Sequence, residues 1–373
     1  MQDFVLIYCS YYDSYYLRNR SMNTGKYITN VSGLQYFQLF RFGTILIISI
    51  LFAKSHLLTE EIGRYEVLLL IAGAVCYFWV SGLIQSLLSL YNNNRSFSGN
   101  PVKSDDRSPV LFNAFLLMIF FTGLATLFVF VFSSFLATTL GGRSEIPCFD
   151  LLILYLLFST PSNLIEYIYL LRNRPRHIIV YGTVTFLLQI VLVGGPVVAG
   201  YGIEYGIAGL VVISGLRFVW LSVLIFRHAR FQFSRLFIRE HISLAAPLII
   251  SIFLSGSAQF VDGFLVAYKF GEARLAVFRY GAREMPVVVL MANAFSTAML
   301  PEFSPAGGIR EAIATLRRKS LRLMHLLFPL TIILLLLSHR LYPIVFNNNF
   351  IDSARVFNLY LLIIVSRLVF PQT

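Results

Sequence analysis

Charged residues are scarce in this sequence. They make up 13% of its 373 residues, against about 25% in typical soluble domains, while hydrophobic residues make up 57%. A soluble core that hides so much apolar surface is not expected in a chain of this length. Apolar runs of about 20 residues, which cross a bilayer as helices, recur along the whole chain. The composition therefore predicts a membrane protein built from helices.

Cysteine is rare, and the common catalytic and nucleotide-binding motifs are missing. Cys9, Cys76 and Cys148 are widely spaced, so we expect neither disulfides nor a metal site. The sequence contains no GxxxxGK[ST], HExxH or GxSxG motif. We expect a protein that is not an enzyme and has no cofactor. If it transports actively, an ion gradient or the gradient of its own substrate would drive it.

The net charge of +12 does not indicate nucleic acid as a partner. In membrane proteins, Lys and Arg gather in cytoplasmic loops beside anionic headgroups. The bilayer is therefore the expected partner of the basic residues.

Ten hydrophobic helices are predicted, and the connections between them are short. Their ranges are 34–54, 65–90, 110–137, 149–171, 178–200, 207–226, 243–268, 280–301, 321–338 and 356–371. The longest connection, 91–109, is too short for a soluble domain. The predicted fold class is an all-α polytopic membrane protein.

Lys and Arg divide unequally between alternate connections. The N-terminal segment and the connections expected on the same side of the membrane carry the larger set, which is Arg18, Arg20, Lys26, Arg41, Arg95, Lys103, Arg107, Arg172, Arg174, Arg176, Arg227, Arg230, Arg235, Arg239, Arg310, Arg317, Arg318, Lys319 and Arg322. The opposite set holds Lys54, Arg64, Arg143, Lys269, Arg274, Arg279, Arg283, Arg340 and Arg355. By the positive-inside rule, the N-terminus is cytoplasmic, and we expect the cytoplasmic (inner) membrane as the location.

A repeat at an offset of 215 residues predicts two lobes. It places Lys54 on Lys269 and Arg64-Tyr65 on Arg279-Tyr280. We expect a six-helix lobe over 27–240 and a partial second lobe over 241–373. The second lobe would lack its last helices, because we expect the chain to be a truncated form of a protein with at least twelve helices. Residues 1–26 are predicted as a non-membrane segment, with Met22 as the true start.

Polar residues within the apolar runs recur at helical spacing and predict a polar cavity. The candidate substrate-binding residues are Arg41, Arg217, Gln259, Asp262, Arg279 and Arg283. Asp262 and Glu166 are candidates for proton or ion coupling. Alternatives remain, because Glu166 would also neutralise an arginine, and Arg279 and Arg283 would also reach outer headgroups. A cationic cavity suits phosphate, since guanidinium binds two oxygens at once.

Three segments resemble the O-antigen-type polysaccharide-biosynthesis flippases of the multidrug/oligosaccharidyl-lipid/polysaccharide exporter superfamily. They are FQLFRFGTILIISILFAKSHLLTEEIGRYEVLLLIAGAV, LAAPLIISIFLSGSAQFVDGFLVAYKFGEARLAVFRYGAREMP and LYPIVFNNNFIDSARVFNLYLLIIVSRLVF, and the likeness covers about residues 27–371. The resemblance implies a two-lobed bundle of twelve to fourteen helices that moves a polyprenyl-diphosphate-linked oligosaccharide outward by alternating access. It implies Arg41, Arg279 and Arg283 as diphosphate ligands, and a polysaccharide polymerase and glycosyltransferases as partners.

Two other functions stay open. A cation-coupled drug antiporter of the same superfamily would need an acidic cavity, whereas the candidate residues here are mainly basic. A membrane polysaccharide polymerase or ligase would be similar to proteins with one long catalytic external loop, and no such loop occurs in the sequence.

Overall fold

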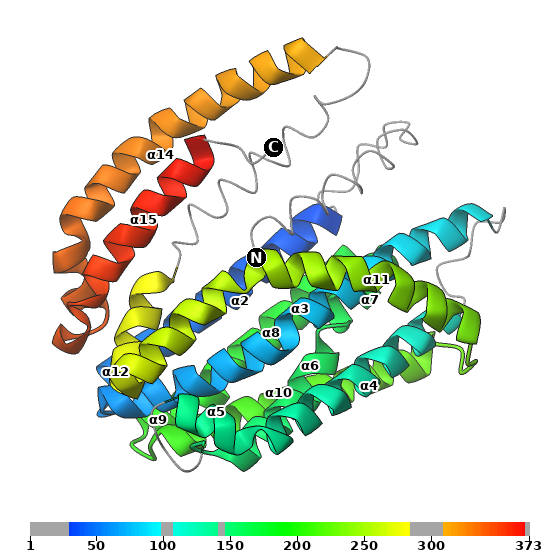
Figure 1. Cartoon of the computed structure of the whole chain (residues 1–373), viewed down its shortest axis with the longest axis horizontal. Helices are drawn as coiled ribbons and strands as arrows, with labels where there is room; N and C mark the ends of the chain where they lie inside the picture. Colours follow the sequence, from blue (N-terminus) through cyan, green and yellow to red (C-terminus); the bar gives the residue numbers. More distant parts are fainter. Residues whose placement is uncertain (1–29, 98–106, 141–145, 284–308, 370–373) are drawn as a thin grey trace. The chain divides into compact units, whose positions relative to one another are not determined.

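The computed structural model describes residues 30–97, 107–140, 146–283 and 309–369 (Figure 1). Regular structure in these ranges is helical, apart from an isolated bridge between Ser108 and Ala229. In chain order the elements are α2 (Asn30–Lys54), α3 (Thr59–Phe97), α4 (Pro109–Val131), α5 (Ser133–Thr139), α6 (Phe149–Ser162), α7 (Ile165–Leu171), α8 (Pro175–Gln189), the π-helical turn η2 (Ile190–Gly194), α9 (Gly195–Val198), α10 (Ile203–His228), α11 (Arg235–Gly256), α12 (Ala258–Ala282), α14 (Ile309–Val345), η5 (Asn348–Phe350) and α15 (Ser353–Val369).

Eight helices in the described residues are long and apolar enough to cross a membrane. They cover Ser32–Lys54, Thr59–Tyr91, Pro109–Val131, Phe149–Leu171, Pro175–Val198, Ile203–His228, Arg235–Gly256 and Phe328–Val345. The prediction of an all-α polytopic membrane protein is therefore confirmed. Most of the predicted eighth helix, 280–301, lies outside the described residues. The predicted tenth corresponds to α15, whose 17 residues are short for a span.

Local sequence sets several helix boundaries. Pro109 and Pro175 occupy the first turns of α4 and α8, where a missing N–H costs nothing. Gly200 and Gly202 have φ of +88° and +91°, which favours glycine, and they form the corner that leads into α10. Within the predicted span 149–171, the chain breaks after Ser162, so that α6 and α7 share one crossing.

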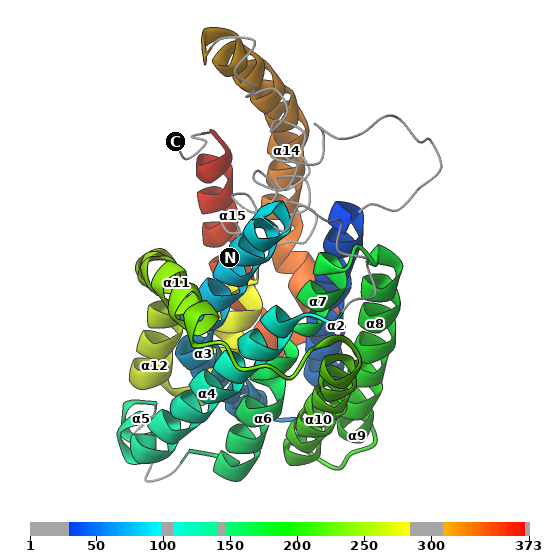
Figure 2. The same ribbon diagram turned by 90° about the vertical axis from the view of Figure 1, so that its right-hand side faces the viewer.

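The described chain divides into two compact units, the first of which is Ile28–Ala276. In this unit α2 packs against α8, α6 against α10 and α3 against α11, as Figures 1 and 2 show. Because α3 is surrounded by neighbours, most of its apolar side chains are buried. The predicted lobe boundary after residue 240 stays a prediction.

Glycines let α3 approach α11 and α12 closely along an antiparallel seam. A Cβ on Gly82 would meet Ile249, one on Gly73 would meet Phe260, and one on Gly63 would meet the backbone of Glu272. Small residues are the usual means of such approach between membrane helices. Residues from Gly63 to Gly82 thus run against α12 and α11 in reverse order.

The second unit begins at Val277 and contains the end of α12 with α14 and α15. The Tyr280 ring stacks on Phe350 at 4.4 Å between centroids, and the Tyr342 hydroxyl donates to the Tyr280 carbonyl at 3.1 Å. The Ser353 hydroxyl donates to the Val277 carbonyl at 2.7 Å. These contacts fix the end of α12 against the start of α15.

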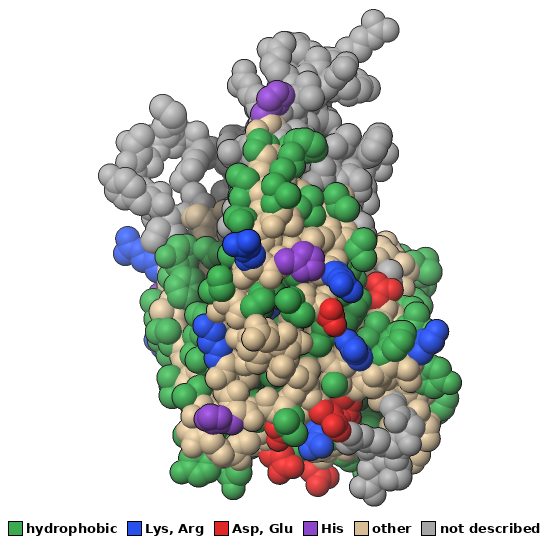
Figure 3. Space-filling view, turned by 90° about the vertical axis from the view of Figure 1, so that its left-hand side faces the viewer, with side chains coloured by type: hydrophobic (Ala, Val, Ile, Leu, Met, Phe, Trp, Pro, Cys, Tyr) green, Lys and Arg blue, Asp and Glu red, His purple; other side chains and the backbone are tan. Residues whose placement is uncertain are grey.

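Many large apolar side chains remain exposed, as a bilayer-embedded surface requires. On α4 they include Phe120, Phe128 and Phe130, each about half exposed or more. The face drawn in Figure 3 likewise carries hydrophobic side chains between scattered charged ones. Lipid is the environment that favours such a surface.

Candidate functional site

The interior of the first unit holds a group of charged side chains from three helices. Arg41 comes from α2, Glu166 from α7 and Arg217 from α10. Glu166 is 4% exposed and interacts electrostatically with both arginines, which are partly buried. The structure therefore brings together three residues that the sequence predicted separately. Two guanidinium groups and one carboxylate leave this group with positive charge.

The group lies deep in the helices. Arg41 is 11 residues past the start of α2, and Arg217 is 11 residues before the end of α10. At 1.5 Å per residue, each is roughly 16 Å from its helix end. These two ends lie on the same side, since α2 and α8 begin together, with Gly33 against Pro175, and α10 runs back along α8. Both arginines are thus at a similar depth within apolar helices.

Two residues that sequence reasoning missed hold Arg217. Its Nη2 donates to Gln189 Oε1 at 2.7 Å, and its guanidinium carbon lies 5.1 Å from the centroid of the Phe186 ring. Its Nε is buried without a hydrogen-bond partner in the described part of the chain. Gln189 is itself buried, on α8. A lone glutamine in an apolar run was the signal that could have identified this contact.

Aromatic side chains lie beside the charged group, where Tyr181 interacts electrostatically with Arg217 and Glu166. The Tyr181 ring stacks on Phe37 at 5.9 Å and meets Trp220 edge-on at 5.5 Å. Trp220 Nε1 donates to the Tyr169 hydroxyl at 3.0 Å. Such walls keep the surroundings apolar while placing a few polar atoms near the arginines, which strengthens electrostatic interactions. The arrangement suits a small, strongly anionic group.

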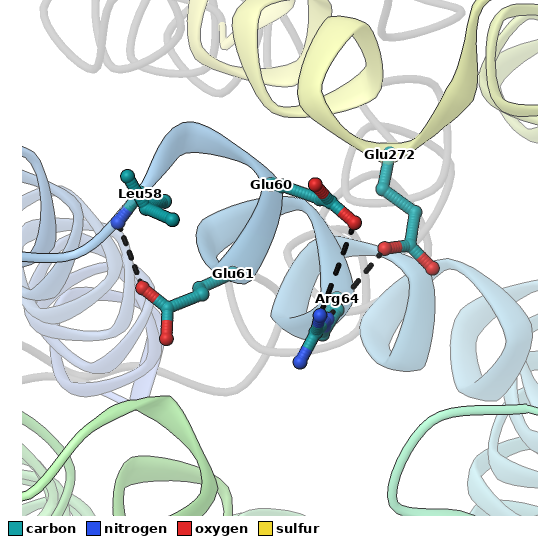
Figure 4. Close-up of polar contacts among 5 residues, drawn as sticks. All are labelled: Leu58, Glu60, Glu61, Arg64 and Glu272. Atoms are coloured by element: carbon teal, nitrogen blue, oxygen red, sulfur yellow. Dashed lines mark hydrogen bonds and ion pairs between the residues drawn. The ribbon is translucent and has the colours of Figure 1, made fainter.

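A second charged group lies at the start of α3 (Figure 4). The Nη2 atom of Arg64 lies 3.8 Å from Glu60 Oε1, and its Nε lies 3.8 Å from Oε2 of Glu272 in α12. The Glu272 side chain is 4% exposed. Next to it, Gly271 has φ of +79°, and the bend it makes brings the Glu272 backbone against Gly63. The structure thus joins the start of α3 to the bend of α12 at Gly271 and Glu272.

Cys148 lies near this end of the first unit, outside the spans. It has φ of +53° and is partly buried. Burial raises the pKa of the Cys148 thiol above its ordinary value, Glu204 raises it further, and Arg64 opposes them. The residue is therefore a neutral thiol at physiological pH.

The remaining predicted site residues have different surroundings. Asp262 is exposed on α12, and the side chain of Gln259 lies outside the described residues. Arg279 and Arg283 are partly buried in the second unit, where the Arg283 guanidinium lies 4.7 Å from the centroid of the Tyr280 ring. Their roles in substrate binding stay predictions.

No cluster of three or more His, Cys, Asp or Glu residues that would suit a metal ion occurs in the described ranges. The chemistry available in the first unit is therefore that of guanidinium, carboxylate, amide and hydroxyl groups.

Comparison with known proteins gives a match at the family level. A sequence model described as "Polysaccharide biosynthesis protein" matches residues 97–355, a range that includes Glu166, Gln189 and Arg217. No curated protein and no solved structure matches the chain.

Proposed function

Since the chain belongs to the polysaccharide biosynthesis protein family, we propose that it is a flippase for a saccharide unit carried on polyprenyl diphosphate. The unit would be an O-antigen or another surface polysaccharide precursor. The protein would move it across the cytoplasmic membrane by alternating access. It would act without chemical change to the substrate, and hence not as an enzyme.

The observation that supports this proposal most is the buried cationic group of the first unit. An unneutralised charge within apolar helices is costly and is usually retained for function. Two arginines around one carboxylate favour an anion over a cationic drug. A diphosphate offers the oxygen pairs that guanidinium binds in a fork.

The proposed orientation fits a substrate that enters from the cytoplasm. With the N-terminus in the cytoplasm, the start of α2 and the end of α10 would be the cytoplasmic ends of the helices that carry Arg41 and Arg217. A lipid-linked substrate is made on that side of the membrane. Glu166 would offset part of the charge of the two arginines between substrates and would serve as a proton acceptor if an ion gradient drives the cycle. A polymerase that uses the flipped unit and the glycosyltransferases that build it are the expected partners.

The test is a flipping assay in cells that lack the chromosomal gene. We expect lipid-linked saccharide units to accumulate in the cytoplasmic leaflet, and the wild-type gene to restore their appearance outside. Arg41→Ala and Arg217→Ala should fail to restore it. Arg239→Ala, which removes an exposed arginine from the start of α11, is the matched control and should restore it fully.

Normal flipping in the absence of the gene would contradict the proposal. Resistance to cationic dyes on expression, with no change in lipid-linked saccharides, would support the drug antiporter instead. Altered polymer length with normal flipping would support a polymerase.

A further inference from the structure

We propose that Gln189 is a positioning residue that fixes the Arg217 guanidinium as an anion ligand, and that the π-helical turn after Gln189 sets this arrangement. The inference rests on the proposed function, because it assigns the diphosphate part of the substrate to Arg217. It adds that Gln189 holds the Arg217 side chain in the position that binds the diphosphate.

Among the described residues, the contacts of Arg217 leave most of its donors for a ligand. Guanidinium has five N–H donors, and the 2.7 Å bond to Gln189 Oε1 uses one of them. The Phe186 ring contacts the guanidinium without taking a hydrogen bond. The Nε atom is buried and has no hydrogen-bond partner among the described residues. Buried polar atoms normally have partners, so a donor of this kind points to a ligand that completes it.

The chemistry of Gln189 fits positioning better than neutralisation. Its amide oxygen accepts from Arg217 but carries no charge, so the guanidinium keeps its full attraction for an anion. A carboxylate at the same place would hold the arginine equally well and cancel its charge. Glu166 already supplies one carboxylate to the two arginines. The neutral amide at 189 therefore preserves the positive charge of the group.

The backbone after Gln189 explains why the amide lies beside Arg217. Ile190–Gly194 forms a π-helical turn, a rare conformation that is frequent at functional sites. A Cβ on Gly209 of α10 would meet the carbonyl of Leu192 in this turn. Gly209 therefore lets α10 lie directly against the turn. Arg217 follows Gly209 by about two helical turns, so the close approach fixes the register between Arg217 and Gln189.

Trp220 provides a probe for the site. The chain has two tryptophans, and Trp220 lies one helical turn from Arg217 with its ring against Tyr181. In a Trp79→Phe background, which keeps a ring to stack on Phe121, Trp220 becomes the single fluorophore. The full-length protein in detergent micelles is titrated with inorganic pyrophosphate, and Trp220 emission reports binding. Sulfate at equal ionic strength controls for general anion effects.

We expect saturable pyrophosphate binding that Arg217→Ala abolishes. Gln189→Leu should weaken the affinity roughly tenfold, the effect of losing one charge-assisted hydrogen bond. Gln189→Glu keeps the hydrogen bond and the shape, and should also weaken binding at least tenfold because it neutralises the arginine. Thr185→Val is the matched control. Thr185 is buried on the same helix and donates to the carbonyl of Tyr181. The pyrophosphate affinity of the Thr185→Val variant should therefore not change.

A merely structural Gln189 would lower thermal stability and leave pyrophosphate affinity unchanged. Equal affinities for Gln189→Leu and Thr185→Val would therefore overturn the positioning role without touching the proposed function. An absence of pyrophosphate binding in the parent protein would overturn the assignment of Arg217 as the anion ligand. The flipping assay in cells, which does not depend on this binding, decides the proposed function separately.

Discussion

At the residue scale, the buried charges of the first unit are compensated in two different ways. Arg217 and Arg41 share one carboxylate, Glu166. Arg64, in contrast, lies between the carboxylates of Glu60 and Glu272. The first group therefore keeps positive charge that suits a ligand, while the second is suited to holding two helices together.

The Arg64 contacts predict unequal effects for the two acids. Glu272→Ala should lower the free energy of unfolding by about 1–3 kcal/mol, since it removes a buried charge from its partner. Glu60→Ala should cost less than about 0.5 kcal/mol, because Glu60 is half exposed and pairs within its own helix. Thermal unfolding in detergent measures both. Equal losses would contradict the view that burial of Glu272 makes its contact the stronger one.

Asn113 makes a second residue-scale prediction. It is fully buried on α4; its Nδ2 donates to the Gln232 carbonyl at 2.8 Å, and its Oδ1 accepts from the Ser234 N–H at 3.0 Å. Asn113→Leu should cost about 1–2 kcal/mol by removing these partners from the Gln232 carbonyl and the Ser234 N–H. Hydrogen exchange at the Ser234 amide should rise in parallel.

Thr122→Val serves as the control for Asn113, because Thr122 is buried on the same helix and donates to the carbonyl of Met118 in α4 itself. Losing the Thr122 hydroxyl should change hydrogen exchange at the Ser234 amide only a little. A similar increase in both variants would show that α4 as a whole, rather than the Asn113 side chain, protects the loop.

At the element scale, the α3 seam predicts a position-dependent effect of the same substitution. Gly63→Ala should destabilise the protein by about 1–3 kcal/mol, because the new methyl group meets the backbone of Glu272, which cannot move as a side chain would. Gly43→Ala in α2 has nothing within 4 Å of the added Cβ. It should stabilise by up to about 1 kcal/mol through helix propensity. Melting temperatures that fall in both variants would refute a specific close approach at Gly63.

Sequence reasoning predicted some elements well and others poorly, for physical reasons. Hydropathy located the spans that became α4 and α10, since lipid exposure requires a continuous apolar run. It ended the second helix near residue 90, whereas α3 continues to Phe97 through polar asparagines, because a helix is not limited to its apolar part. It placed the start of the ninth helix at 321, whereas α14 begins at Ile309. Polar helix extensions carry no hydropathy signal.

The candidate site was predictable to the extent that charge is rare in apolar runs. That rarity identified Arg41, Glu166 and Arg217 as residues of interest. Nothing in the sequence indicated that α2, α7 and α10 bring them together, because this depends on helix packing. The role of Phe186 was hidden for the same reason, since an aromatic residue in an apolar helix is ordinarily a packing or lipid-facing residue.

At the scale of the whole molecule, Cys148 offers a test of the proposed orientation. It lies just before the start of α6, on the side opposite the start of α2. In a Cys9→Ser variant, an impermeant maleimide should label Cys148 from outside intact spheroplasts. Cys76, which is buried in α3, should stay unlabelled, and Cys148→Ser should remove the signal. Labelling that requires permeabilised membranes would contradict a cytoplasmic N-terminus.

The pH dependence of that labelling follows from the raised pKa of Cys148. The thiolate reacts, and its fraction at neutral pH is lower than in a free cysteine. Labelling should therefore be slow at pH 7 and should still be rising above the pKa of free cysteine. Glu204→Gln, which removes a nearby negative charge, should lower the pKa and speed labelling at pH 8.

The π-helical turn Ile190–Gly194 also says how the chain tolerates changes in length. A turn of this kind holds one residue more than the α-helical turn that would replace it. Deleting a single residue there would leave an unbroken α-helix in which the later residues keep their direction relative to Gln189, because the turn takes up the extra residue. The surface that meets Leu51 and Gly209 would therefore still face them. A one-residue deletion within this turn should be tolerated far better than one within α8 before it, where the loss of a residue rotates the rest of the helix by about 100°.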